Sequence, residues 1–144
     1  MTSVKPPFRV DDIHAPVLMG AVLRQVGEIV VSEDWGGLRL SHIRVISGIP
    51  EEGISITALG ERTGMTKQGC GQFVAHLVDT GHLRVDRDPA DRRVRRVHRT
   101  VAGDRFMAEV ADRMRRLEED WADEVGEQRY RTFRAVLEEV ARGR

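Results

Sequence analysis

The sequence predicts a mainly α-helical protein with one small β-hairpin, and three observations support this prediction. Apolar residues recur every three or four positions along most of the chain, which is the spacing of one helix face. A Gly-Met-Thr turn at 64–66 joins two short helical segments. Residues 83–87 instead alternate apolar and polar side chains before an Asp-Pro turn, and residues 94–99 can return as the partner strand of a hairpin.

Two helices are predicted in the part of the chain before the Gly-Met-Thr turn. Residues 15–32 carry apolar side chains at helical spacing, and the two glycines after Trp35 interrupt that pattern. A second, short helix then follows, with Ser41 as its predicted N-cap and Pro50 beyond its end.

Two further helices flank the Gly-Met-Thr turn. Ser55 and Thr66 are their predicted N-caps, and Gly64 ends the first of them. The second helix places apolar residues at positions i, i+3, i+4 and i+7, which predicts its buried face: Cys70, Phe73, Val74 and Leu77. The opposite face has no acidic residue and consists of Lys67, Gln68, Gly71, Gln72, Ala75 and His76. This pair forms a helix-turn-helix.

The hairpin follows this helix-turn-helix directly. Residues 83–87 alternate as a strand, and 94–99 form the return strand. Asp88 and Pro89 suit the first two positions of a type I turn between them. A hairpin in this place is the wing of a winged helix-turn-helix.

Two long helices complete the predicted fold, one over 100–122 and one ending near 142. The length of 144 residues suits one domain. We therefore predict a single domain over 1–144, with a winged-helix lobe at 38–103. The N-terminal helix at 13–34 and the C-terminal helices at 104–142 are its predicted dimerisation helices.

Composition and charge limit the classes of function that the protein can have. The chain is 40% apolar and 32% charged, and no apolar run approaches the ~20 residues of a membrane-spanning helix. The N-terminus lacks the apolar stretch of a signal peptide, and a single cysteine, Cys70, excludes an internal disulfide. We therefore expect a cytoplasmic protein. From its helical phase, we interpret Cys70 as a small buried apolar residue rather than a redox sensor.

Charge is segregated, although 23 basic and 23 acidic residues cancel in total. Residues 1–53 and 104–144 each carry a net charge of −2, whereas residues 54–103 carry +4. A basic middle can attract an anionic partner locally, because salt screens the acidic ends beyond about 8–10 Å.

Several stretches resemble the MarR family (multiple antibiotic resistance regulators) of bacterial transcription factors. Residues 56–68 are similar to its helix-turn-helix, 81–93 resemble its signature entry into the wing, and 100–103 match the threonine and glycine that open its fifth helix. The resemblance implies a homodimer whose two winged helices bind a palindromic operator in double-stranded DNA. It also implies a small-molecule effector, of unknown identity, bound between the dimerisation helices and the lobe.

The candidate DNA-binding residues fall into two groups. On the second helix of the helix-turn-helix, Gln68 and Gln72 can each pair with adenine in the major groove, while Thr66 and Lys67 suit phosphate. Gly71 either allows close approach to DNA or is a weakness that packing tolerates. The whole first group is Thr66, Lys67, Gln68, Gly71, Gln72 and His76.

The second group lies on the wing. Arg92 and Arg93 are at the hairpin tip, where guanidinium groups can enter a narrow minor groove. The resemblance maps the family's Asp-x-Arg pair onto Asp91 and Arg93, with the aspartate orienting the arginine. Arg95 completes the group. The family usually has apolar residues in this return strand where the chain has Arg95, Arg96 and Arg99.

No catalytic, cofactor or metal site is predicted. The sequence has no Gly-rich phosphate loop, nucleophile elbow or HExxH motif, and its scattered histidines and one cysteine do not complete a zinc site. We interpret the chain as a non-enzymatic DNA-binding regulator that acts as a repressor. The alternative is a winged helix that binds other proteins and has no sequence-specific affinity for DNA.

Overall fold

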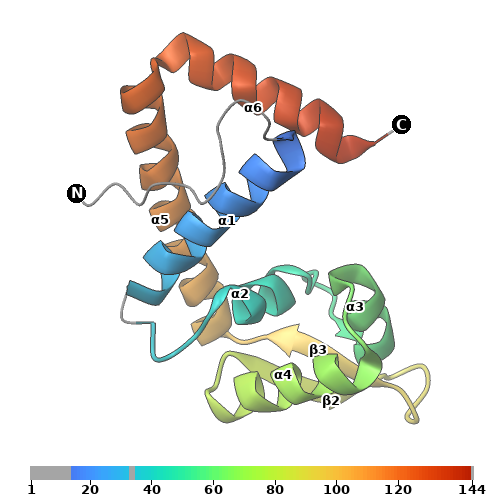
Figure 1. The fold of residues 1–144 in the computed structure, drawn as a ribbon. Coiled ribbons are helices and arrows are strands. Elements are labelled where there is room, and N and C mark those ends of the chain that lie inside the picture. The colour runs from blue at the N-terminus through green and yellow to red at the C-terminus, as the bar shows by residue number, and fades with distance from the viewer. Residues whose placement is uncertain (1–13, 33–34, 144) are drawn as a thin grey trace.

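The computed structural model describes residues 14–32 and 35–143. Within them, a lobe of three short helices and a small sheet lies at one end of a frame of three longer helices (Figure 1). The frame consists of α1 (Ala15–Ser32), α5 (Val101–Val125) and α6 (Glu127–Arg142), and α5 runs out of the lobe to carry α6. Residues 13, 33 and 34 of the predicted first dimerisation helix lie outside the described residues.

The sheet of the lobe has three antiparallel strands in the order β1-β3-β2. The predicted hairpin supplies β2 (Leu83–Arg87) and β3 (Arg95–Arg99), with Val97 opposite Val85. The third strand, β1 (Ile54–Ser55), was not predicted; it pairs with the other edge of β3. Two residues are too short to show the alternation that identifies a strand.

The helix-turn-helix is confirmed, with both of its N-caps. Ser55 Oγ accepts a hydrogen bond from Ala58 N (3.2 Å) at the start of α3 (Ile56–Thr63). Thr66 Oγ1 accepts one from Gly69 N (3.0 Å) at the start of α4 (Lys67–Asp79). Between the helices, Gly64 has a φ of 69°, a left-handed conformation that glycine adopts without steric cost.

The second helix, α2 (Leu40–Ser47), begins earlier than the sequence predicted. Its N-cap is Arg39 rather than Ser41, because the side chain of His42 closes the helix end. His42 Nδ1 accepts a hydrogen bond from Arg39 N at 2.9 Å. A histidine three residues after the cap thus accepts a hydrogen bond from the backbone N–H of the N-cap residue, as the last residue of a capping box does.

The core of the lobe lies between α2, α3, α4, the sheet and the first half of α5. The predicted inner face of α4 is confirmed, since Cys70, Val74 and Leu77 are buried and Phe73 is half-buried. Other apolar residues of this core are Val45, Ile46, Ile49, Leu59, Leu83, Val97, Phe106 and Val110. Because these apolar residues of α4 are buried in the core, the opposite face of the helix points towards solvent.

The wing is joined firmly to the start of α5. Thr100 Oγ1 donates a hydrogen bond to Gly81 O (2.6 Å) and accepts one from Gly103 N (3.0 Å), which caps α5. A Cβ at Gly103 would lie 2.2 Å from His82 O, so only glycine lets the helix approach the strand this closely. The start of α5 therefore packs directly against the turn that precedes β2.

None of the described helices is long and apolar enough to cross a membrane.

Candidate nucleic-acid interface

The first two turns of α4 present a polar, acid-free surface. Lys67, Gln68 and Gln72 are exposed there, and Gly71 is half-exposed between them. Thr66 is also exposed, although its hydroxyl oxygen already caps the helix. These side chains are held outward because the opposite side of the same turns is buried at Cys70 and Val74.

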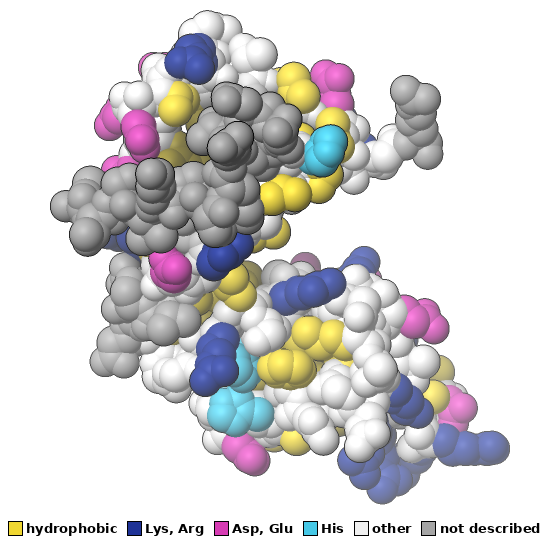
Figure 2. Space-filling view, viewed as in Figure 1, with side chains coloured by type: hydrophobic (Ala, Val, Ile, Leu, Met, Phe, Trp, Pro, Cys, Tyr) yellow, Lys and Arg dark blue, Asp and Glu magenta, His cyan; other side chains and the backbone are white. Residues whose placement is uncertain are grey.

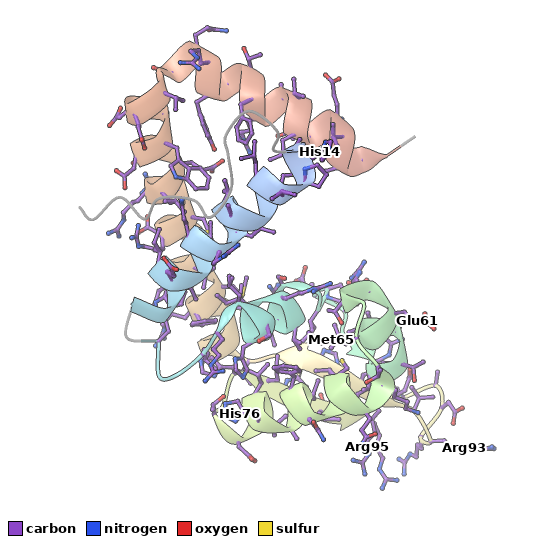
Figure 3. The ribbon with its side chains drawn as sticks, viewed as in Figure 1. His14, Glu61, Met65, His76, Arg93 and Arg95 are labelled. Atoms are coloured by element: carbon purple, nitrogen blue, oxygen red, sulfur yellow. The ribbon has the colours of Figure 1, made fainter. Side chains whose placement is uncertain are left out.

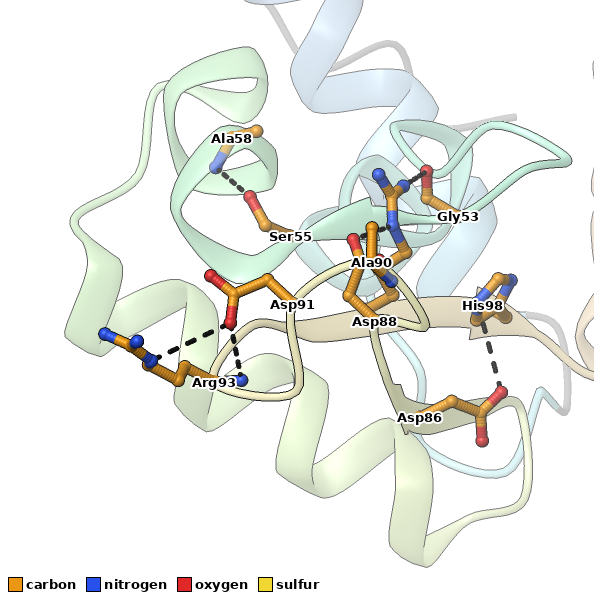
Figure 4. Close-up of polar contacts among 10 residues, drawn as sticks. Gly53, Ser55, Ala58, Asp86, Asp88, Ala90, Asp91, Arg93 and His98 are labelled. Atoms are coloured by element: carbon orange, nitrogen blue, oxygen red, sulfur yellow. Dashed lines mark hydrogen bonds and ion pairs between the residues drawn. The ribbon is translucent and has the colours of Figure 1, made fainter.

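The wing loop has a defined shape that depends on two aspartates. Asp88 N donates to Val94 O (2.8 Å), and Val94 N donates to Asp91 O (2.9 Å), which closes the loop. Asp91 Oδ1 accepts from Arg93 N (3.1 Å) and lies 3.9 Å from Arg93 Nε (Figure 4). The side chain of Arg93 is 94% exposed, so this pair contributes little to stability and leaves the guanidinium available.

The structure brings the wing to the N-terminal end of α4. Arg93 and Arg95 project away from the lobe at that end, whereas His76 lies at the other end of the helix (Figure 3). The first two turns of α4, which carry Lys67, Gln68 and Gln72, therefore lie at the same end of the lobe as Arg93 and Arg95, and His76 does not. Instead, the ring of His76 lies with its centroid 5.1 Å from that of His42. The pKa of His42 is lowered, first by burial of its ring and then by electrostatic interaction with His76 and Arg39.

The three arginines of the return strand have different surroundings. Arg95 is exposed, as expected for a candidate DNA contact. Arg96 instead pairs with Asp88 (Nε to Oδ2, 2.8 Å), and Arg99 pairs with Asp104 (Nε to Oδ1, 3.0 Å). These two internal pairs were not predicted from the sequence. Strand register alone would not have supplied them, because Arg96 lies opposite Asp86 in the sheet and Asp104 belongs to α5.

Residues 37–94 match the sequence model of the MarR family. This winged-helix segment is therefore similar to members of the MarR family. Comparison with curated proteins gave no match.

Several solved structures share the fold of the chain beyond this segment. The crystal structure of MarR matches at a TM-score of 0.81 with 20% identity, over 94% of this chain and 93% of MarR. PcaV from Streptomyces coelicolor, in complex with its natural ligand, matches at 0.71 with 18% identity, over 96% and 99%. FabT from Streptococcus pneumoniae, in complex with DNA, matches at 0.73 with 14% identity, over 88% and 92%. The predicted winged helix with flanking helices is confirmed by these similarities.

Cys70 lies in the core of the lobe rather than at an accessible site. Cys70 is fully buried, and burial raises the pKa of its thiol, which suppresses the nucleophilic thiolate. Among residues 14–32 and 35–143, no three His, Cys, Asp or Glu side chains are grouped so that they could hold a metal ion.

Proposed function

We propose that the protein is a transcriptional regulator that binds double-stranded DNA and acts as a repressor. The observation that carries this proposal is the shared location of the polar face of α4 and the wing arginines. Figure 2 displays Lys and Arg side chains gathered at the end of the lobe that carries the wing. A helix such as α4 fits the ~12 Å major groove, while a guanidinium beside it reaches the minor groove or the phosphates.

Each predicted residue has a distinct role in this proposal. Gln68 and Gln72 read base edges, and Thr66 and Lys67 bind phosphate near the start of α4. Arg92, Arg93 and Arg95 supply positive charge from the wing. His76 is left at the periphery because of its distance along the helix from the wing.

A homodimer is the second part of the proposal. No residue of α6 is buried, and its apolar face remains in contact with solvent, as does much of α1. Contiguous exposed apolar surface of this kind marks an interface. The residues concerned are Val17, Leu18, Met19, Val22 and Leu23 of α1, and Phe133, Val136, Leu137 and Val140 of α6. Two copies joined through these helices would present two α4 helices to a palindromic operator.

A small-molecule effector is the third part. A groove of about 560 Å³ lies between α1 and α2, where the dimerisation helices meet the lobe. Its lining is Leu23, Arg24, Gly27, Glu28, Arg39, Leu40 and Ser41. An effector bound there would shift the protein between DNA-binding states only if its affinity differs between them.

The proposal is tested by titrating labelled duplex DNA with the purified protein at several salt concentrations. Specific and random duplexes should both bind with an affinity that falls as salt rises. For each phosphate contact, the logarithm of the affinity should fall by about 0.9 for every tenfold increase in salt concentration. A duplex selected by the protein from a random pool should bind more tightly than random DNA. A folded dimer with no salt-dependent affinity for any duplex would instead favour the protein-interaction alternative.

A further inference from the structure

Asp88 and Arg96 connect the base of the wing to a distant turn. Asp88 Oδ2 accepts a hydrogen bond from Arg96 Nε (2.8 Å), and Arg96 Nη1 donates another to Gly53 O (3.1 Å) (Figure 4). The other carboxylate oxygen of Asp88 accepts from Ala90 N (2.8 Å), inside the wing loop. One guanidinium therefore links the first turn of the wing loop to the backbone before β1.

The acceptor at Gly53 is held in place by its own packing. Gly53 is buried and has a φ of 80°, and a Cβ on it would lie 2.4 Å from the ring of His98. The backbone of this turn consequently rests directly on β3. A carbonyl fixed in this way is a rigid anchor, so the guanidinium bonded to it restrains the wing.

The side chains of this connection are more enclosed than those of the wing tip. Asp88 is 15% exposed and Arg96 is 37% exposed, compared with 94% for Arg93. The hydrogen bond from Arg96, with that from Ala90 N, also holds the pKa of the Asp88 carboxyl below its usual range. The aspartate is thus ionised at neutral pH, and its attraction for Arg96 is fully present.

We propose that Asp88 and Arg96 are positioning residues that hold the wing loop at the angle at which Arg92 and Arg93 reach DNA. This inference rests on the proposed DNA-binding function. Arg96 differs from Arg93 and Arg95 in this account: its guanidinium serves two internal acceptors, and its effect on DNA passes through the wing. Asp88 is the informative partner, because it is negatively charged and lies beside a surface that would bind an anion.

The decisive variant is Asp88→Asn. Removal of one negative charge near DNA should by itself tighten binding. Loss of the ionic bond to Arg96 should instead weaken binding, by roughly three- to tenfold, because the wing arginines are no longer held in place. The matched control is Glu52→Gln, which removes an exposed acid next to Gly53 and leaves the connection intact. We expect the control to bind as tightly as the wild type or more tightly.

A double-mutant cycle separates wing positioning from general loss of structure. We expect Arg93→Ala to cost less affinity in the Asp88→Asn background than in the wild type, whereas Gln72→Ala should cost the same in both. The probe is a duplex selected by the wild-type protein from a random pool. Binding of Asp88→Asn equal to that of Glu52→Gln, with an unchanged cost of Arg93→Ala, would overturn the inference.

Hydrogen exchange gives a readout that does not need DNA. The amide of Val94, which is bonded to Asp91 O within the wing loop, should exchange faster in Asp88→Asn than in Glu52→Gln, at equal melting temperature. Faster exchange supports the inference even if no duplex binds, in which case the proposed function alone fails. Unchanged exchange contradicts the inference whether or not DNA binds.

Discussion

The phenolic hydroxyl of Tyr130 donates a hydrogen bond to Glu118 Oε1 at 2.7 Å, joining α6 to α5 across the bend between them. Arg134 Nε lies 3.5 Å from the same carboxylate oxygen, so one acid of α5 receives two side chains of α6. A hollow of about 420 Å³ borders this contact. The direction of α6, and with it the direction of the apolar face proposed for dimerisation, depends on this group of three.

The titration of Tyr130 should report this contact. Burial and the Glu118 carboxylate raise the pKa of Tyr130 to about 12, above the ordinary value of 10.0. The raised pKa means that the contact stabilises the folded state fully below pH 10 and is lost as the pH rises towards 12. Because Tyr130 is the only tyrosine, its ionisation can be followed by ultraviolet absorbance. A folded-state midpoint near 10, as in denatured protein, would contradict the prediction.

Replacement of Arg93 by alanine should weaken binding to every duplex. Its exposed guanidinium is expected to contact phosphate or the minor groove, so its loss should reduce the slope of log affinity against log salt by about one unit. Salt titrations of wild-type and Arg93→Ala protein measure this slope. Arg129→Ala removes an exposed arginine of α6 and should leave the slope unchanged. Equal slopes for all three proteins would exclude the wing from the electrostatic contribution.

Local features of the lobe were predictable from the sequence because their causes are local. The caps at Ser55 and Thr66 act on backbone groups three residues away, and the burial of Cys70 and Leu77 follows from helical spacing within one element. The bond from Asp91 to the Arg93 backbone is similarly short in range. Such features need no knowledge of the rest of the fold.

Other features depend on which distant segments meet, and the sequence did not reveal them. The strand at 54–55 exists only because β3 has a free edge for it, and Arg96 reaches Gly53 across 43 positions of the chain. Helical phase likewise places His76 on the outward face of α4 but does not give its distance from the wing. Strand register and element placement decide these three cases.

A charge on the apolar face of α6 should separate the proposed dimer. Leu137 is 37% exposed in the single chain, so Leu137→Arg should leave the fold of that chain intact. In a dimer, the same charge would be buried without a partner, which is costly. Light scattering should give twice the chain mass of 16.3 kDa for the wild type and the single mass for the variant. Glu139→Arg, on the other side of α6, is the matched control and should remain dimeric.

Gln68 and Gln72 should control specificity without controlling general affinity. Replacement of either by alanine should cost ~1–3 kcal/mol on a selected duplex, the value of one bidentate base contact, and little on random DNA, because no charge is lost. Paired titrations at fixed salt measure both quantities. Gln128→Ala in α6 serves as the control. Equal losses on the two duplexes, or none, would mean that α4 does not read the sequence.

Gly71 should reveal a conflict between stability and DNA binding. A Cβ built at Gly71 would meet nothing within 4 Å, so no packing inside the protein requires glycine there. At Gly69, by contrast, a Cβ would lie 3.0 Å from the capping oxygen of Thr66. Glycine in the middle of a helix costs roughly 0.5–1 kcal/mol relative to alanine, and at Gly71 nothing in the single chain offsets that cost.

We therefore expect Gly71→Ala to raise the free energy of unfolding by about 0.5–1 kcal/mol and to lower the affinity for a selected duplex by at least ~1 kcal/mol. The added methyl group would stand between Gln68 and Gln72, where base edges or a phosphate must approach the helix. Gly69→Ala should show no such gain in stability, because its methyl group displaces the Thr66 cap. Denaturant unfolding and DNA titration of the same preparations measure the two changes. A variant that is both more stable and equally tight on DNA would show that no DNA atom approaches α4 at this position.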